Sequence, residues 1–212
     1  MDIKELEGGI TTALNEATVE VFSTMLMMEV KAQDSFVKDE KNVSTDLISS
    51  LHFFGDKYMG KIAIFSSATV ACNIANAMLG TETTEVNEEI KDGMGELVNM
   101  IAGVAKVKLT DTLGDMHLLT PWVIAGRHLS ISSSEGGDTS SDGVDFALDS
   151  QASFSWVMSK VEYDKGVFLV GVQPNAVPEE NKASSIANRE LESLKEEIKE
   201  LKAVIERSKS KA

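Results

Sequence analysis

Two stretches of this chain, 80 residues apart, carry the same helical pattern of apolar side chains. The first pattern predicts a helix that ends near Met28, and the second predicts a helix from about Val86 to about Leu109. The repeated positions are Ile10, Leu14, Ala17 and Val21 in the first helix and Ile90, Met94, Leu97 and Ile101 in the second. Segments typical of β-strands follow both helices. We therefore expect an internally duplicated α-β-β unit.

The segments between and after these helices predict a sheet. Residues 45–54 and 61–65 flank a glycine-containing turn, which indicates two paired strands, and residues 66–79 predict a helix with a serine N-cap that ends at Gly80. Further strands are predicted at 118–126, 128–134, 146–162 and 166–172. About six strands with helices between the two halves predict an α+β fold, in which an antiparallel sheet carries the long helices on one face.

The composition is that of one globular domain with an appended segment. The chain has 212 residues, of which 42% are apolar and 25% are charged. No apolar run reaches the roughly 18 residues of a membrane-spanning helix, and the N-terminus is acidic, unlike a signal peptide. We therefore expect a cytoplasmic protein. Its single cysteine, Cys72, excludes an internal disulfide and lies in an apolar run, which predicts a buried, unreactive thiol.

The net charge of −14 belongs entirely to the first part of the chain. Residues 1–178 hold 12 basic and 26 acidic side chains, whereas residues 179–212 hold 8 of each. An acidic surface repels nucleic acid and anionic lipid, because binding to either rests largely on contacts of Lys and Arg with phosphates. We therefore expect a protein partner, and neither a nucleic acid nor a membrane.

Two segments fall outside the repeated units. Residues 179–212 are predicted to form a linker and a C-terminal heptad helix, whose apolar seam is Leu191, Leu194, Ile198, Leu201 and Ile205. Two chains could pair along this seam as a coiled coil, which favours a homodimer, or the helix could pack on its own domain. Residues 133–145 are dense in Ser, Gly and Asp, and the spacing of their aspartates favours a solvated loop over a calcium site.

One arc of the second helix combines four unusual residues. At 100° per residue, Asp92, Asn99 and Gly103 lie within about 60° of Glu96, while the apolar stripe lies about 100–160° away from it. A glycine inside a helix costs about 1 kcal/mol relative to alanine, which is easier to understand where something must approach the backbone. A merely solvated helix face would also be polar, but the combination of Asp, Glu, Asn and Gly favours a functional site.

The segment that contains this arc, KDGMGELVNMIAG, resembles the motif of the CheC, CheX and FliY chemotaxis phosphatases. In that motif an acidic residue or Ser is followed four residues later by Glu, and Asn comes three residues after the Glu. The order of helices and strands is similar to the family over about residues 1–173. In the repeat register, the first helix places at the corresponding positions Thr12, Glu16, Val19 and Ser23. A valine cannot orient water, so we expect one working site, as in CheX-like members.

The resemblance implies a phosphatase that hydrolyses the aspartyl phosphate of a CheY-type response regulator. Asn99 would orient the attacking water and Glu96 would pair with a lysine of the regulator, while Asp92 and Gly103 would contribute to partner binding. The Mg²⁺ of the reaction would be bound by the phosphorylated partner, and we expect no cofactor or metal site of the chain's own.

Two alternatives to an enzyme remain. One is a non-catalytic adaptor that binds a receiver domain or a flagellar-switch component through the same helix. The other is a structural oligomer organised by the C-terminal heptads, which would leave the polar arc unexplained. Asn99 beside Glu96 favours the enzyme, because docking alone needs no amide that orients water.

Overall fold

The computed structural model describes residues 3–33, 36–38, 44–132, 145–147 and 156–177. Every helix and strand among them belongs to one compact unit, Met1–Ala176. The predicted heptad helix within residues 179–212 and nearly all of the predicted loop 133–145 lie outside the described residues. No helix in the described ranges is long and apolar enough to cross a lipid bilayer.

Helices form where the apolar periodicity predicts them, and their ends carry the expected caps. The Ser67 hydroxyl accepts a hydrogen bond from the Val70 amide at 3.3 Å, and Gly80 follows the helix with a left-handed φ of 69°. The side chain of Asn87 likewise accepts a hydrogen bond from the Ile90 amide at 3.0 Å. The helices are α1 (Ile3–Met25), α2 (Ala68–Leu79) and α3 (Glu88–Leu113).

The two long helices end differently from the prediction. α1 ends at Met25, because Met27 adopts a left-handed φ of 54° and the Met28 amide donates a hydrogen bond back to the Phe22 carbonyl at 3.0 Å. α3 continues beyond Leu109 to Leu113. In the repeat register the end of α1 corresponds to Ala105, so α3 is the longer helix by about two turns at this end.

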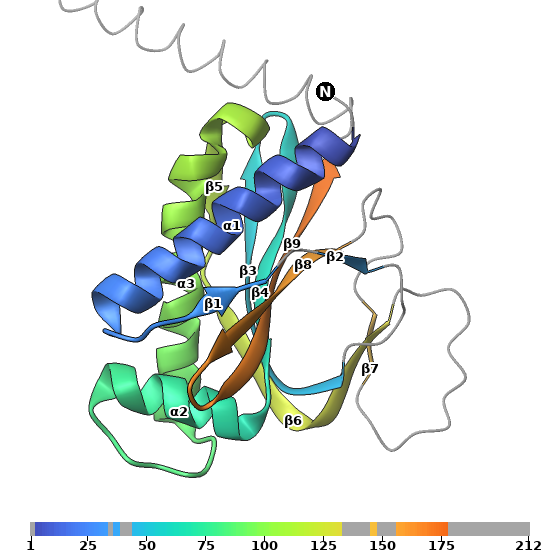
Figure 1. Ribbon diagram of the computed structural model, residues 1–212. Coiled ribbons are helices and arrows are strands. Elements are labelled where there is room, and N and C mark those ends of the chain that lie inside the picture. Colours follow the sequence, from blue (N-terminus) through green and yellow to red (C-terminus); the bar gives the residue numbers. More distant parts are fainter. Residues whose placement is uncertain (1–2, 34–35, 39–43, 133–144, 148–155, 178–212) are drawn as a thin grey trace, which may run out of the picture. The chain divides into compact units, whose positions relative to one another are not determined.

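The strands form one curled sheet behind the helices (Figure 1). Their order is β1-β8-β9-β4-β3-β6-β7, with β2 also paired to β8 and β5 to β3. Among the described residues all of these pairings are antiparallel except that of β6 with β7. The strands are β1 (Lys31–Ala32), β2 (Phe36–Lys38), β3 (Ser44–Gly55), β4 (Tyr58–Ser66), β5 (Met116–Leu118), β6 (Trp122–Ser132), β7 (Asp145–Ala147), β8 (Trp156–Tyr163) and β9 (Gly166–Ala176).

Two strand predictions differ from the structure. The segment 146–162, predicted as one strand, contains parts of two strands, β7 and β8, which pair with different neighbours. The segments 118–126 and 128–134, predicted as separate strands, are mainly one continuous strand, β6. The interruption around Gly126 is a bulge, because residues 126–128 of β6 stand opposite the single residue Asp46 of β3. A Cβ at Gly126 would lie 2.9 Å from a methyl group of Leu129, so a glycine fits this bulge where a larger residue would not.

The core lies between the helices and one face of the sheet, which confirms the predicted α+β arrangement with the long helices on one face. Neighbouring strand residues alternate between the two faces: Ile62 and Ile64 point into the main core with the helices, while Ala63 and Phe65 belong to a smaller cluster on the opposite face. The predicted buried thiol is confirmed, since Cys72 lies in the main core and burial raises its pKa.

Candidate functional site

The predicted apolar stripe of α3 is fully buried. Its four residues, Ile90, Met94, Leu97 and Ile101, have no exposed surface. On the other side of the helix Asp92 and Glu96 are exposed, while Asn99 and Gly103 are half-buried. The core therefore holds α3 in a fixed rotation, and that rotation presents the predicted polar arc to the surroundings.

Glu96 and Asn99 lie side by side on this arc. The Asn99 amide nitrogen, Nδ2, donates a hydrogen bond to Glu96 Oε2 at 3.5 Å, a contact between neighbours one turn apart. A separation of 3.5 Å is at the outer limit for a hydrogen bond, so the contact aligns the two side chains only weakly. A partner that offers shorter hydrogen bonds could displace it at small cost.

Three glycines of α3 face different surroundings. A Cβ at Gly93 would lie 3.2 Å from the Ala75 Cβ of α2, and a Cβ at Gly95 would lie 3.5 Å from Val123 Cγ2 of β6. These two glycines let neighbouring elements pack closely on the helix. Gly103 is different, because a Cβ there would meet no atom within 4 Å among the described residues. Packing within this part of the chain therefore does not explain the glycine at position 103.

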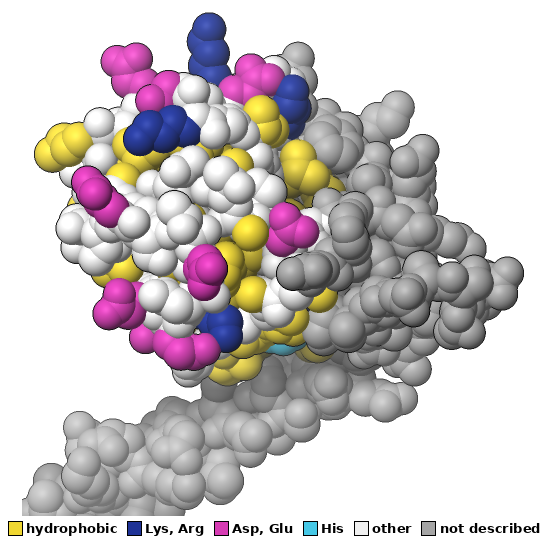
Figure 2. Space-filling view, turned by 90° about the horizontal axis from the view of Figure 1, so that it is seen from below, with side chains coloured by type: hydrophobic (Ala, Val, Ile, Leu, Met, Phe, Trp, Pro, Cys, Tyr) yellow, Lys and Arg dark blue, Asp and Glu magenta, His cyan; other side chains and the backbone are white. Residues whose placement is uncertain are grey.

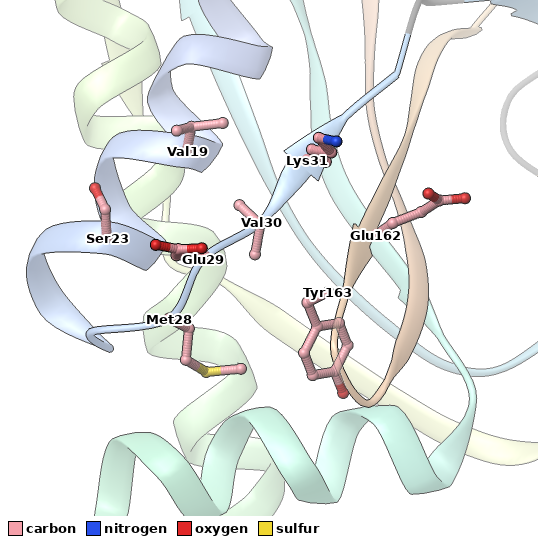
Figure 3. A pocket seen from close by; sticks show the side chains of 8 residues that line it. All are labelled: Val19, Ser23, Met28, Glu29, Val30, Lys31, Glu162 and Tyr163. Atoms are coloured by element: carbon pink, nitrogen blue, oxygen red, sulfur yellow. The ribbon is translucent and has the colours of Figure 1, made fainter.

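The corresponding face of α1 has a different character. Val19, at the position of Asn99, is 39% exposed, and Thr12, Glu16 and Ser23 are exposed as well. Val19 and Ser23 line an open hollow of about 500 Å³ between α1, the segment of Met28 to Lys31 and the end of β8 (Figure 3). In this view Val19 presents only methyl groups. The residue of α3 that corresponds to it in the repeat register is Asn99, which carries an amide.

Glu16, the one motif residue that α1 retains, has a partner within the chain. Lys108 of α3 contacts Glu16 Oε2 and Glu20 Oε2, each at 3.3 Å. The hydrogen bonds that Lys108 donates to Glu16 and Glu20 raise its pKa. This ion pair was not predicted from the sequence. On the helical wheel Lys108 lies at the same angle as the buried apolar stripe, and a charged residue at that angle could have indicated a contact with another element.

The surface around the arc is acidic. Asp92, Glu89 and Glu88 are exposed on the first turns of α3, where the helix dipole favours negative charge, and Lys91 pairs with Glu88 at 2.7 Å. Seen from the end where α2 and the loop into α3 lie, acidic side chains are spread over the surface (Figure 2). In the described part of the chain, no group of three His, Cys, Asp or Glu side chains is arranged to hold a metal ion.

Known proteins share sequence and fold with this chain. A family model described as "Chemotaxis phosphatase CheX" matches residues 47–141, a range that contains the whole arc. The chain is 27% identical over 128 residues to the CheY-P phosphatase CheX of Thermotoga maritima, which covers 60% of this chain and 83% of that protein. This chain is thus similar to CheX.

Solved structures show a similar fold. A crystal structure of the chemotaxis protein CheX from Desulfovibrio desulfuricans matches with a TM-score of 0.64 and 23% identity, covering 78% of this chain and 99% of that one. The complex of CheX with CheY, BeF3 and Mg²⁺ from Borrelia burgdorferi matches with a TM-score of 0.54 and 18% identity, covering 77% of this chain and 96% of that one. The predicted likeness to the CheC, CheX and FliY phosphatases is confirmed.

Proposed function

We propose that this chain is a phosphatase of CheY-type response regulators, with Glu96 and Asn99 as its site. The observation that carries the proposal is the pairing of these two side chains on the outward arc of α3, within the range that matches CheX. In the reaction, a water oxygen attacks phosphorus and the bond to the aspartyl oxygen breaks. The products are inorganic phosphate and a free carboxylate on the regulator.

Asn99 is proposed to orient the attacking water. A carboxylate inserted at the phosphoryl group would be repelled by the phosphoryl oxygens, whereas a neutral carboxamide both donates and accepts hydrogen bonds. Asn99 is half-buried beside the helix surface, so its amide is better ordered than that of a fully exposed side chain. Such positioning is the main contribution that a protein can make to phosphoryl transfer.

Glu96 is proposed to dock the regulator. It is exposed, and its contact with Asn99 is long enough to be replaced by a charge-assisted hydrogen bond to a lysine of the partner. Asp92 adds negative charge to the same rim. Gly103 leaves open space above the helix backbone, which would let the partner's backbone approach closely.

The Mg²⁺ of the reaction is proposed to come with the phosphorylated regulator. The complex from Borrelia burgdorferi contains CheY, BeF3 and Mg²⁺ together with CheX. This chain, in its described residues, offers no cluster of ligands for a metal of its own. Its residues act on the water and on the docking contacts, while the metal neutralises charge on the phosphoryl oxygens.

We further propose that the fold arose by internal duplication and that only the second unit is active. The strand order β1-β8-β9-β4-β3-β6 supports this proposal. If β1 is exchanged with β6, β3 with β8 and β4 with β9, the result is the same order read backwards. The turn of each hairpin is Asp-Lys, at 56–57 and at 164–165, a shift of 108 residues. Ala63 and Gly171 are also 108 apart and pair with each other, which is expected where a pseudo-twofold axis crosses the sheet.

The helices repeat after 80 residues and the hairpins after 108, so the second unit contains 28 additional residues between its helix and its hairpin. The segment 133–155 lies in this interval. In the first unit Val19 stands at the position of Asn99, and Glu16 is engaged by Lys108. A single site per chain is therefore proposed.

Three further predictions from the sequence remain proposals: the chain forms a homodimer, it is located in the cytoplasm, and residues 179–212 pair through their heptads.

A phosphate-release assay tests the proposed function. Each CheY-type receiver of the source genome would be phosphorylated with acetyl phosphate, freed of excess donor, and followed in Mg²⁺ with and without substoichiometric amounts of the full chain. We expect at least one receiver to lose its phosphoryl group faster. Binding to a beryllofluoride-activated receiver without any acceleration would instead support the adaptor function.

A further inference from the structure

Val107 of α3 is unusually exposed for a valine in a well-packed helix. Its side chain is 75% exposed, and among the large apolar side chains of the described residues only Met27 is more exposed. At 100° per residue, Val107 lies about 20° from Glu96 and about 40° from Gly103 around the helix. It therefore extends the arc of Glu96 and Asn99 toward the C-terminal end of α3.

The exposure of Val107 does not come from loose packing of the helix end. Leu109 is 1% exposed and Leu113 is fully buried, so the core holds this part of α3 on its inner side. Lys108 contacts both Glu16 and Glu20 of α1 at 3.3 Å. Ala105, before Val107, is also fully buried, so this part of α3 is held against the core and Val107 points outward from it.

Val107 also lies within reach of a partner centred on the site. With a rise of about 1.5 Å per residue, it is about 6 Å from Gly103 and about 12 Å from Asn99 along the helix axis. A transient interface buries at most roughly 600 Å² on each partner, which corresponds to a patch of about 14 Å radius. Val107 is also turned about 80° around the helix from Asn99, so a receiver domain centred over Asn99 would reach Val107 at the edge of such a patch.

The arc is polarised along the helix. Toward the N-terminal end it carries the exposed carboxylates of Asp92 and Glu89, while toward the C-terminal end it carries Gly103 and Val107, with the half-buried Lys106 beside them. A partner that matches this pattern has a basic group over the first turns of α3 and an apolar surface over its C-terminal half. The reverse orientation would place a basic group on Val107 and apolar surface on carboxylates.

We propose that Val107 is a docking contact for the receiver domain, and that it contributes to the orientation of docking. This inference rests on the proposed phosphatase function. Val107 makes no contact with the reacting atoms, so it acts on the affinity of the complex and leaves the chemical step unchanged once the complex has formed.

The test compares Val107→Asp and Val107→Ala with Val167→Asp in steady-state dephosphorylation of a receiver phosphorylated with acetyl phosphate. Val167 is a matched control, because it is also a valine, is 41% exposed and lies on β9, which contributes no residue to the arc. We expect Val107→Asp to raise KM about fivefold or more with kcat nearly unchanged, and Val107→Ala to raise it less. The control should match the wild type.

Three outcomes would overturn the inference. An unchanged KM in Val107→Asp, with a normal circular dichroism spectrum, would show that the receiver does not cover this side chain. A loss of kcat at unchanged KM would assign Val107 to the chemical step. A change in sedimentation behaviour with unchanged receiver affinity would assign it to contacts between copies of the chain. If the wild-type chain accelerates no receiver's dephosphorylation, the proposed function itself fails, and titration of a beryllofluoride-activated receiver then decides the docking contact separately.

Discussion

Lys108 Nζ lies 3.3 Å from Glu16 Oε2 and thereby links the two long helices of the fold. Glu16 stands at the position in α1 that Glu96 occupies in α3. One glutamate is engaged by a lysine of its own chain, and the other is exposed beside an asparagine. The two glutamates thus differ: Glu16 joins α1 to α3, whereas Glu96 is exposed on α3 and available to a partner.

Asn99→Ala should lower kcat for receiver dephosphorylation by about a hundredfold or more, because loss of the group that positions the nucleophile acts on the transition state. Binding of a beryllofluoride-activated receiver should change by less than about threefold. Single-turnover phosphate release and a binding titration measure the two quantities. Thr24→Ala is the control, since Thr24 is exposed on α1, which contributes no residue to the arc. Near-normal turnover by Asn99→Ala would end its assignment as the water-orienting group.

The first helix provides a contrasting experiment. Glu16→Ala should leave dephosphorylation unchanged, whereas Glu96→Ala should raise KM, because only Glu96 faces the regulator in the proposal. Val19→Asn restores an amide at the corresponding position of α1 and is expected to create at most a weak second activity, best measured in an Asn99→Ala background. A large loss of activity in Glu16→Ala, without a fall in melting temperature, would contradict a single site per chain.

Gly103→Ala should increase the stability of the chain and lower its phosphatase activity. Because a Cβ at position 103 has no atom within 4 Å, alanine should stabilise the chain by up to about 1 kcal/mol through its helix propensity. The same methyl group should lower kcat/KM if the regulator's backbone approaches the helix there. Gly93→Ala is the matched control and should gain less stability, since its Cβ would meet Ala75 and Leu79 at 3.2 and 3.3 Å. Unchanged kcat/KM in Gly103→Ala would remove Gly103 from the docking surface.

Because of His52, we expect the folded chain to lose stability on mild acidification. Burial, and next the charge of Lys61, lower the pKa of His52 from its ordinary 6.5. The unfolded chain therefore binds a proton at His52 more readily than the folded chain does. The stabilising contribution is fully present above pH 6.5 and is lost as the pH falls toward the lowered pKa.

Urea denaturation between pH 7 and pH 5 measures this effect. His52→Gln should make the free energy of unfolding depend less on pH than in the wild type. His117→Gln is the control, because His117 is exposed and stacks on Phe54, with ring centroids 5.2 Å apart. Equal pH dependence in wild type and His52→Gln would rule His52 out as the group responsible.

Local pattern was sufficient to predict the helices and the arc, because the rotation of α3 follows from Ile90, Met94, Leu97 and Ile101 alone. What could not be predicted depends on residues far apart in the sequence. The bulge at Gly126 exists because β6 pairs with β3, about 80 residues earlier, and the early end of α1 depends on the left-handed Met27. Lys108 acquires its role only because α1 packs against α3.

The heptad pattern of residues 179–212 predicts that this segment contributes to dimerisation and not to catalysis. Removing residues 185–212 should lower dimer stability and spare phosphatase activity, because Glu96 and Asn99 belong to a different element. Once two domains are associated, pairing of three heptads becomes effectively intramolecular, which offsets the entropy that makes short coiled coils marginal. Replacement of Leu194, Ile198 and Leu201 by Asp should reproduce the effect of truncation.

Sedimentation over a dilution series measures the dissociation of wild type, truncated chain and triple variant. Ala203→Asp is the control, since position 203 falls outside the apolar seam and a charge there should leave dimerisation unchanged. Dissociation at higher concentration in the two seam variants alone would support pairing of the heptads. Identical dissociation in all four proteins would mean that the seam packs on its own domain or binds another partner, because a seam that joins two chains cannot lose its apolar residues without weakening the dimer.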